Sequence, residues 1–312
     1  MEHPIRSLHH VTATVDDAQQ DLDFCVDALG LRLVKKTVNF DNRNVYHFYY
    51  GDETGTPGTI WTTFPYKGWN VPIGTKGLGQ VGVTSFSVPE GSLPFWRSRL
   101  AARGITAAEA PARFGEPSLV FTDPSGLTLE LVAAADARAP WTDGGVPEAH
   151  AIRGLHSVTL TVDSPKPTVA LLERLLNCVI VDEADGRVRV AVNGDRPGHR
   201  LDILHGTGAG PALNGIGTVH HVALAISSPD EQRRLRQELI DYGCRVTEVR
   251  DRCYFESIYF REPGGVLIEV ATMRPGFTLD EAAGELGNGL KLPPWEEPNR
   301  AAIEEGLPRV ST

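Results

Sequence analysis

The chain has 312 residues, of which 41% are hydrophobic and 22% are charged, and its formal net charge is -10 at pH 7. This composition is typical of a soluble globular protein of about two domains, and the negative charge opposes nonspecific binding to nucleic acids. Because the first residues contain no apolar signal region and no apolar stretch is long enough to cross a bilayer, we expect a cytoplasmic protein with neither a nucleic-acid nor a membrane partner.

A similar pattern occurs four times along the chain: an apolar strand, a capped helix, and further strands that end near a glycine-containing turn. The first copy predicts, in order, a strand over 8–15, a helix from Asp17 to Gly30, and strands over 46–50 and 59–64. The second copy predicts a strand near 81–84, a helix over 92–102 and a last strand over 127–131.

The other two copies follow the same order of elements. The third predicts a strand over 155–162, a helix after Ser164, and strands over 188–192 and 201–204. The fourth predicts a strand over 219–224, a helix that begins with a capping box at Ser228 and Glu231 and ends at Gly243, and a strand over 264–270. The repeat therefore organises residues 8 to 270.

One β-α-β-β-β module cannot bury both faces of its own sheet, so we expect an α+β fold in which four modules pair into two curved sheets with helices outside. We assign modules one and two to an N-terminal segment, 1–135, and modules three and four to a C-terminal segment, 150–275. A stretch rich in Ala, Asp, Gly and Pro, 133–153, is the expected linker. Residues 276–312 are expected to form an irregular arm.

The tripeptide His-His-Val occurs twice, each time opening an apolar, strand-like run. When the modules are aligned on their first strands, modules one and four carry His10 and His221, whereas modules two and three carry Gly82 and Ser157. Neutral imidazole is the commonest protein ligand for iron, zinc and nickel. A histidine-based metal site therefore needs modules one and four together.

At the last-strand position, module four carries Glu269, module two carries Glu130, module one carries Thr62 and module three has no obvious carboxylate. Glu269 lies among Val, Leu and Ile residues, where a carboxylate is costly unless it is paired or binds a metal. We interpret His10, His221 and Glu269 as a facial triad, which is typical of non-haem Fe(II) oxygen chemistry; Mn(II) is the second choice of metal. Thr62 in place of a fourth ligand leaves coordination positions for substrate and O2.

Three groups of residues carry a resemblance that runs through nearly the whole chain. They are Ser-Leu-His-His-Val-Thr at 7–12, Gly-Thr-Pro-Gly-Thr at 55–59 with Thr-Thr-Phe-Pro at 62–65, and Tyr-Phe-Glu-Ser at 254–257 with Tyr259 and Pro-Gly-Gly at 263–265. The chain resembles the vicinal oxygen chelate superfamily of glyoxalases, extradiol dioxygenases and bleomycin-resistance proteins, and within it the hydroquinone ring-cleaving dioxygenases of the 2,6-dichlorohydroquinone type.

The resemblance implies roles for particular residues. The second histidine of each pair and the late glutamate would hold the metal, which selects His10, His221 and Glu269 again. Residues around the metal and the substrate would be His9, Thr12, His220, Arg252 and Tyr259. Two departures bear on substrate size: Cys253, where relatives can have glycine, and a different run over 69–77.

The implied activity is that of a non-haem Fe(II) dioxygenase that inserts both atoms of O2 into a para-hydroquinone, with or without chlorine or alkyl substituents. Its partners would be O2 and a small aromatic substrate, and a homo-oligomer is left open. The alternatives are a glyoxalase-like isomerase or lyase, an extradiol catechol dioxygenase and a metal-free binding protein. Thr62 argues against the four-ligand isomerase site, and the triad argues against a metal-free protein.

Several of these residues also have a purely structural interpretation. Adjacent residues of a strand face opposite sides, so only one histidine of each pair should look into the cavity, and His9 and His220 could equally be hydrogen-bonded core residues. Tyr259 could be a packed core residue, and Arg252 a solvated charge at a strand end. We expect structural roles for the remaining strand histidines, His47, His156 and His205, and a hydrogen bond or ion pair for Glu130.

Overall fold

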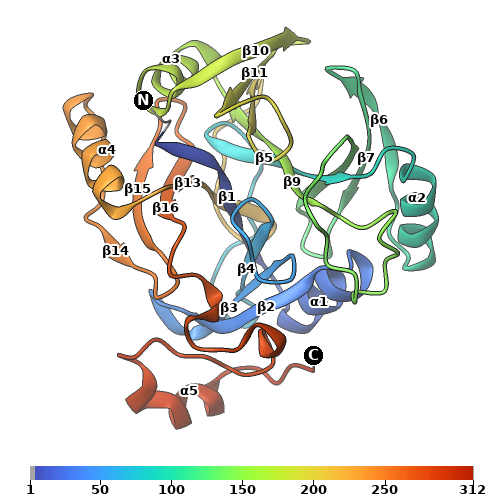
Figure 1. The fold of residues 1–312 in the computed structure, drawn as a ribbon, viewed down its shortest axis with the longest axis vertical. Coiled ribbons are helices and arrows are strands. Elements are labelled where there is room, and N and C mark those ends of the chain that lie inside the picture. Colours follow the sequence, from blue (N-terminus) through green and yellow to red (C-terminus); the bar gives the residue numbers. More distant parts are fainter. Residues whose placement is uncertain (1–3, 312) are drawn as a thin grey trace.

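The computed structural model describes residues 4–311, and within them each of the four expected modules is present (Figure 1). Module one comprises β1 (Ile5–Val15), α1 (Ala18–Leu22), the π-helical segment η1 (Asp23–Ala28), β2 (Arg32–Asn39), β3 (Asn42–Gly51) and β4 (Ile60–Pro65). Module two comprises β5 (Gln80–Val88), α2 (Leu93–Ala102), β6 (Ala108–Arg113), β7 (Glu116–Thr122) and β8 (Thr128–Ala133).

Modules three and four repeat this order. Module three comprises β9 (Gly154–Val162), α3 (Pro165–Leu176), β10 (Cys178–Ala184), β11 (Arg187–Val192) and β12 (Arg200–His205). Module four comprises β13 (Thr218–Ile226), α4 (Pro229–Asp241), β14 (Arg250–Asp251), β15 (Glu256–Arg261) and β16 (Leu267–Thr272). The capping expected for the first and last helices is confirmed, because Asp17 accepts hydrogen bonds from the amides of Gln19 and Gln20, and Ser228 accepts one from that of Glu231.

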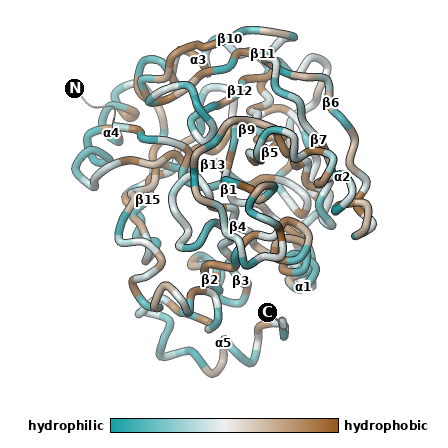
Figure 2. Tube along the Cα trace, turned by 45° about the vertical axis from the view of Figure 1, so that its right-hand side comes forward, coloured by the Kyte–Doolittle hydropathy of each residue, from teal (hydrophilic) through white to brown (hydrophobic). Residues whose placement is uncertain are grey.

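The strands form two eight-stranded sheets, which confirms the α+β fold of four modules in two curved sheets. The first sheet has the order β14-β15-β16-β13-β1-β4-β3-β2, and the second has the order β10-β11-β12-β9-β5-β8-β7-β6. Hydrophobic residues follow central strands such as β9 and β13, and α4 is mostly hydrophilic (Figure 2). No helix within residues 4–311 has the length and apolar character that crossing a bilayer requires.

The sheets do not follow the expected division of the chain into 1–135 and 150–275. Module one pairs with module four and module two with module three, because β1 hydrogen-bonds to β13 and β5 to β9. The expected linker, 133–153, connects two strands of the same sheet. Its composition marks an exposed connection rather than a boundary between the sheets.

The register of the first sheet places the candidate ligands on neighbouring strands. Thr12 pairs with His221 across β1 and β13, Ala223 pairs with Glu269 across β13 and β16, and Thr12 pairs with Thr62 across β1 and β4. Thr62 is therefore the counterpart of Glu269 in module one, as the module alignment predicts.

The second sheet corrects that alignment at two positions. Val83, which pairs with Thr159, is the counterpart of His221, because Gly82 is an unpaired bulge residue. Asp202 pairs with Thr159 and is therefore the carboxylate counterpart of Thr62 in module three, which the module alignment overlooks although Asp202 lies in the predicted strand over 201–204. The bulge at Gly82 is not visible from the sequence and shifts the strand alignment by one residue, whereas Asp202 is visible as a carboxylate between Leu201 and Ile203.

The C-terminal arm packs against the first sheet. It contains three short 3-10 turns and one helix: η2 (Phe277–Leu279), η3 (Ala283–Glu285), η4 (Glu297–Asn299) and α5 (Arg300–Gly306). Fully buried Lys35 on β2 forms ion pairs with Asp280, at 2.6 Å, and with Glu281. The Phe277 ring lies 4.9 Å from that of Tyr49 on β3. The arm is therefore held by both charge and aromatic packing.

We predict that Asp21 makes stability depend on pH. Burial raises the pKa of this carboxyl from 3.8 to about 7, although hydroxyl groups of Thr63 and Tyr50 donate to it at 2.5 Å and 2.7 Å. Its contribution to stability is therefore present in full at low pH and is lost as pH rises through about 7. The loss should reach about 1.4 kcal/mol per pH unit between roughly pH 4 and 7.

The variant Asp21→Asn lacks this titration. Urea unfolding of both proteins between pH 5 and 8 should give a free-energy difference, variant minus wild type, that increases with pH. A difference that stays constant over this range would contradict the prediction.

A second stability prediction concerns Cys253, which adopts a left-handed backbone conformation with φ of 65°. This conformation disfavours side chains that have a Cβ atom and is the usual reason for glycine at such positions. Cys253→Gly should stabilise the protein by about 0.5–1 kcal/mol in denaturant unfolding. Cys253→Ala keeps the strain and serves as the control, and a glycine variant no more stable than the alanine variant would refute the argument.

Candidate metal centre

Three strands of the first sheet bring the candidate ligands to one point. His10 lies on β1, His221 on the neighbouring antiparallel strand β13, and Glu269 on β16, which runs parallel to β13. All three side chains are at most 5% exposed. They come from opposite ends of the chain, and only the pairing of modules one and four brings them together.

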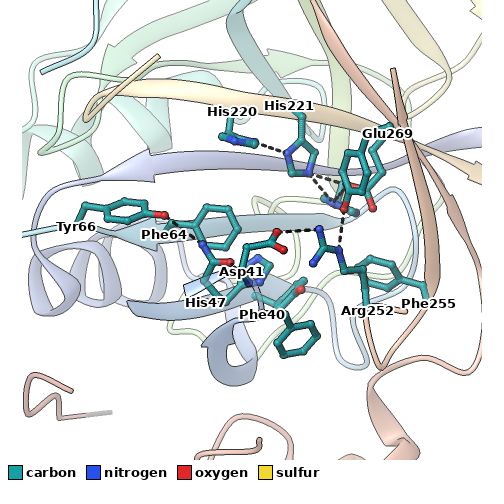
Figure 3. A pocket seen from close by; sticks show the side chains of 14 residues that line it. Phe40, Asp41, His47, Phe64, Tyr66, His220, His221, Arg252, Phe255 and Glu269 are labelled. Carbon is teal, nitrogen blue, oxygen red and sulfur yellow. Dashed lines mark hydrogen bonds and ion pairs between the residues drawn. The ribbon is translucent and has the colours of Figure 1, made fainter. Parts of the chain in front are cut away.

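The donor atoms converge closely enough to share one ion. His221 Nε2 lies 2.7 Å from Glu269 Oε2, His10 Nε2 lies 3.3 Å from the same oxygen, and the two Nε2 atoms are 3.3 Å apart. The three ligand atoms all lie within 4.8 Å of one another, and they form the single such group of three or more found among residues 4–311. The arrangement is a two-histidine, one-carboxylate set, of which His221 and Glu269 are labelled in Figure 3.

The electrostatics put two of these groups in the protonation state that metal ligands need. Burial alone would raise the pKa of Glu269, but His10 and His221 lower it well below its usual range, so this carboxylate is ionised. Burial lowers the pKa of His221 against the opposing effect of Glu269, which favours a neutral imidazole. Metal ligands must be deprotonated in this way.

Two β-bulges explain the paired histidines. Between β1 and β13 the register skips His9 and His220, so neither residue follows the strict alternation expected from sequence. Each ring instead lies beside its neighbour: His9 Nδ1 is 2.8 Å from His10 Nδ1, and His220 Nδ1 is 2.8 Å from His221 Nδ1. Burial lowers the pKa of both His9 and His220 to about 3, which keeps them neutral.

Neutral His9 and His220 can therefore accept hydrogen bonds from the Nδ1–H groups of the two candidate ligands. That tautomer leaves the Nε2 atoms of His10 and His221 free to face the centre. A hydrogen-bond acceptor at the other ring nitrogen commonly fixes the tautomer of metal-bound histidines in this way. The sequence predicts that His9 and His220 lie near the candidate metal centre but does not predict this geometry, because no bulge is visible in it.

Further side chains surround Glu269. The Ser257 hydroxyl donates to Glu269 Oε1, and Tyr259 pairs with Glu269 across β15 and β16. Arg252 Nε donates to the Tyr259 hydroxyl at 3.1 Å, and its Nη2 lies 3.0 Å from an oxygen of Asp41. Burial, with the charge of Glu269, raises the pKa of Tyr259, so its phenol stays protonated.

A cavity of about 200 Å³ opens onto this centre (Figure 3). Six predicted residues line it: His10, His220, His221, Arg252, Tyr259 and Glu269. The other two do not: His9 lies behind His10, and the Thr12 hydroxyl is bonded by Thr62. Sequence reasoning missed the remaining wall, which comprises Asn39, Phe40, Asp41, His47, Tyr49, Phe64, Tyr66 and Phe255. His47 carries a signal as a histidine within an apolar run, and Phe64 and Phe255 lie in the segments that carry the family resemblance.

The equivalent position of the second sheet is filled by ion pairs. Glu130 accepts hydrogen bonds from Ser85 at 2.6 Å and Ser118 at 2.7 Å and pairs with Arg113, which confirms the hydrogen bond or ion pair predicted for it. Asp202 lies 2.7 Å from Arg189 Nε. Each carboxylate therefore has a guanidinium partner.

Comparison with known proteins agrees with this architecture. The sequence profile of the Glyoxalase/Bleomycin resistance protein/Dioxygenase superfamily matches residues 7–131 and 154–270. The Bacillus subtilis (strain 168) protein "Putative ring-cleaving dioxygenase MhqE" is 43% identical over 305 residues, which cover 97% of this chain and 98% of the relative. The chlorohydroquinone/hydroquinone 1,2-dioxygenase of Sphingobium indicum is 36% identical and is covered to 93%, with 94% of this chain aligned.

Solved structures give the same result. A crystal structure of a B. subtilis protein described as a "putative dioxygenase" superposes with a TM-score of 0.94 at 41% identity, with 99% of each chain covered. Glyoxalase I from Zea mays has a TM-score of 0.64 at 14% identity, with 85% of this chain and 92% of that chain covered, and shares the fold. The resemblance predicted from the motifs is confirmed. The chain belongs to the Glyoxalase/Bleomycin resistance protein/Dioxygenase superfamily.

Proposed function

We propose that the protein is a non-haem Fe(II)-dependent ring-cleaving dioxygenase that acts on para-hydroquinones, with or without chlorine or alkyl substituents. The observation that carries this proposal is the buried set of His10, His221 and Glu269 at the end of a cavity lined by aromatic side chains. Relatives named as ring-cleaving and hydroquinone dioxygenases, similar over nearly their whole length, support the dioxygenase class.

The donor set fits a divalent metal. An ionised carboxylate and two imidazole nitrogens meet in a buried place, where a carboxylate is costly without a cation. Two histidines and one carboxylate with open positions favour Fe(II), with Mn(II) second, over the closed tetrahedral sites typical of structural zinc. A metal held by His10, His221 and Glu269 supplies Lewis-acid polarisation and a template for substrate and O2.

The surrounding residues position the ligands and the substrate. His9 and His220 accept the Nδ1 protons of the two histidine ligands and fix their orientation. Arg252 donates to the Tyr259 oxygen and orients this phenol, which stays protonated and lines the cavity, toward a substrate oxygen. Thr12 acts through Thr62 rather than on the substrate, since the Thr62 hydroxyl donates to it at 2.9 Å.

Three other activities have less support. A glyoxalase-type isomerase requires a fourth ligand where Thr62 is hydrogen-bonded to His47 and Thr12. A metal-free binding protein gives no reason for the buried triad. An extradiol catechol dioxygenase differs in its substrate, which the activity assay below distinguishes. The cytoplasmic location stays a prediction.

Metal binding tests the triad. We predict that Glu269→Gln weakens Fe(II) or Mn(II) binding by at least about 100-fold, because the variant lacks the only carboxylate of the set. Metal content per chain after anaerobic reconstitution, together with the metal-dependent increase in melting temperature, measures the effect. Glu130→Gln, the equivalent strand position of the second sheet, is the matched control and should bind metal as wild type does. Full metal occupancy in Glu269→Gln would refute the assignment.

Oxygen consumption tests the reaction. We predict that anaerobically Fe(II)-reconstituted protein consumes one O2 per molecule of hydroquinone or chlorohydroquinone, and that Glu269→Ala consumes none. A preference for catechol would change the proposed substrate class. No consumption with one bound iron per chain would exclude the dioxygenase proposal in favour of an isomerase or binding function.

A further inference from the structure

The cavity contains a histidine that the proposed chemistry does not yet use. His47 lies on β3, far in sequence from both His-His pairs, and lines the same cavity as the triad. Its ring packs between Tyr49 and Phe64, whose ring centroids lie 4.0 Å and 4.3 Å away. These two ring contacts restrict the orientation of the imidazole.

A hydrogen-bond chain fixes which nitrogen of His47 carries the proton. His47 Nε2 lies 2.8 Å from the Thr62 hydroxyl, and that hydroxyl donates its own proton to Thr12 at 2.9 Å. The Thr62 oxygen must therefore accept from His47, so the proton of a neutral His47 is on Nε2. Burial lowers the pKa of His47 well below its usual value, which agrees with a neutral ring. Nδ1 then carries a lone pair.

That lone pair opens into the cavity. Within residues 4–311, His47 Nδ1 has no hydrogen-bond partner. The side-chain polar atoms that are both fully enclosed and without a hydrogen-bond partner belong to Thr37, Gln80, Thr84, Arg153, Gln232 and Glu256. His47 Nδ1 is not one of them, so it is not fully enclosed by protein. Since His47 lines the cavity, Nδ1 is an acceptor accessible from it.

Three other polar side chains of the cavity, Asn39, Asp41 and Tyr66, already have donors. Asn39 Oδ1 accepts from the Asp41 amide at 2.9 Å, and the Tyr66 hydroxyl accepts from Asn39 Nδ2 at 3.1 Å. The Asp41 carboxylate is paired with Arg252. The imidazole of His47 therefore presents an acceptor that a bound ligand can use without breaking an existing contact.

We propose that His47 Nδ1 accepts a hydrogen bond from the substrate hydroxyl group that does not bind the metal, and thereby selects diphenols over phenols that lack a second hydroxyl donor. The inference rests on the proposed function and names the residue that recognises the second hydroxyl group of the substrate. A substrate hydroxyl that is buried without an acceptor weakens binding. The His47 acceptor should therefore make the dissociation constant of a diphenol about 10-fold to 100-fold lower than it would be without that acceptor.

Binding without turnover tests this contact. Fe(II)-loaded protein is titrated calorimetrically, without O2, with hydroquinone and with 4-methoxyphenol, which keeps one hydroxyl and replaces the second with a methyl ether. Wild type should bind hydroquinone at least tenfold more tightly. His47→Leu should bring the ratio of the two dissociation constants close to one, chiefly by weakening hydroquinone binding. His47→Asn, whose amide oxygen can take the place of Nδ1, should retain part of the preference.

Two further variants make the test decisive. Thr62→Val removes the acceptor of the Nε2 proton and should also lower the ratio, which covers the case in which His47→Leu does not fold. His205→Asn changes a histidine of the second sheet that is exposed and lies outside the cavity, and it should leave the ratio unchanged.

The outcomes separate the two proposals. A wild-type protein that consumes O2 with hydroquinone and a His47→Leu variant with an unchanged binding ratio would overturn the role of His47 alone. An iron-loaded wild type that neither binds hydroquinone nor consumes O2 would overturn the proposed function and this inference with it.

Discussion

The antiparallel pairing of β1 with β13 is the contact on which the candidate site depends. It joins the first module to the last, so that His10 and His221, more than two hundred residues apart in the chain, lie on adjacent strands. The parallel pairing of β13 with β16 then adds Glu269. Because all three ligands are on central strands of one sheet, the backbone hydrogen bonds of that sheet hold the geometry.

The bulges in this pairing have a chemical consequence. A regular strand would turn His9 and His220 to the opposite face from the ligands. Skipping one residue in each strand instead brings each of these rings within 2.8 Å of the ligand ring that follows it. The outer hydrogen-bond partners of both histidine ligands therefore come from the ligands' own strands, and the sequence signature of this arrangement is the His-His dipeptide itself.

The second sheet shows what the same framework does without a metal site. Its carboxylates Glu130 and Asp202 are as buried as Glu269, and each has an arginine partner, Arg113 or Arg189. Glu269 has two imidazoles instead. A buried carboxylate needs a compensating charge, and in the first sheet our proposal assigns that charge to a bound cation. The difference between the two sheets therefore lies in the residues and not in the fold.

The sequence predicts the four modules and the triad because both depend on local pattern: strand periodicity, helix caps, and a carboxylate in an apolar run. It does not predict that module one pairs with module four, although the metal argument requires residues from both. Bulges also escape it, which is why the module alignment places Gly82 at the position of His221, where the structure has Val83. The cavity wall around Asn39 and His47 escapes it too, because those side chains approach the candidate metal centre only through tertiary packing.

The C-terminal arm, which lies outside the modules, supports one wall of the cavity. Phe255 forms part of the cavity wall and contacts the rings of His9 and His10, with centroids 4.9 Å and 5.4 Å away. Its neighbour Tyr254 is held by the arm, through a hydrogen bond from its hydroxyl to Asp280 at 3.0 Å and one from the Gly276 amide to its carbonyl at 2.9 Å. Because Asp280 is itself paired with Lys35 of β2, the arm joins the two edges of the first sheet and fixes the aromatic wall against the metal ligands.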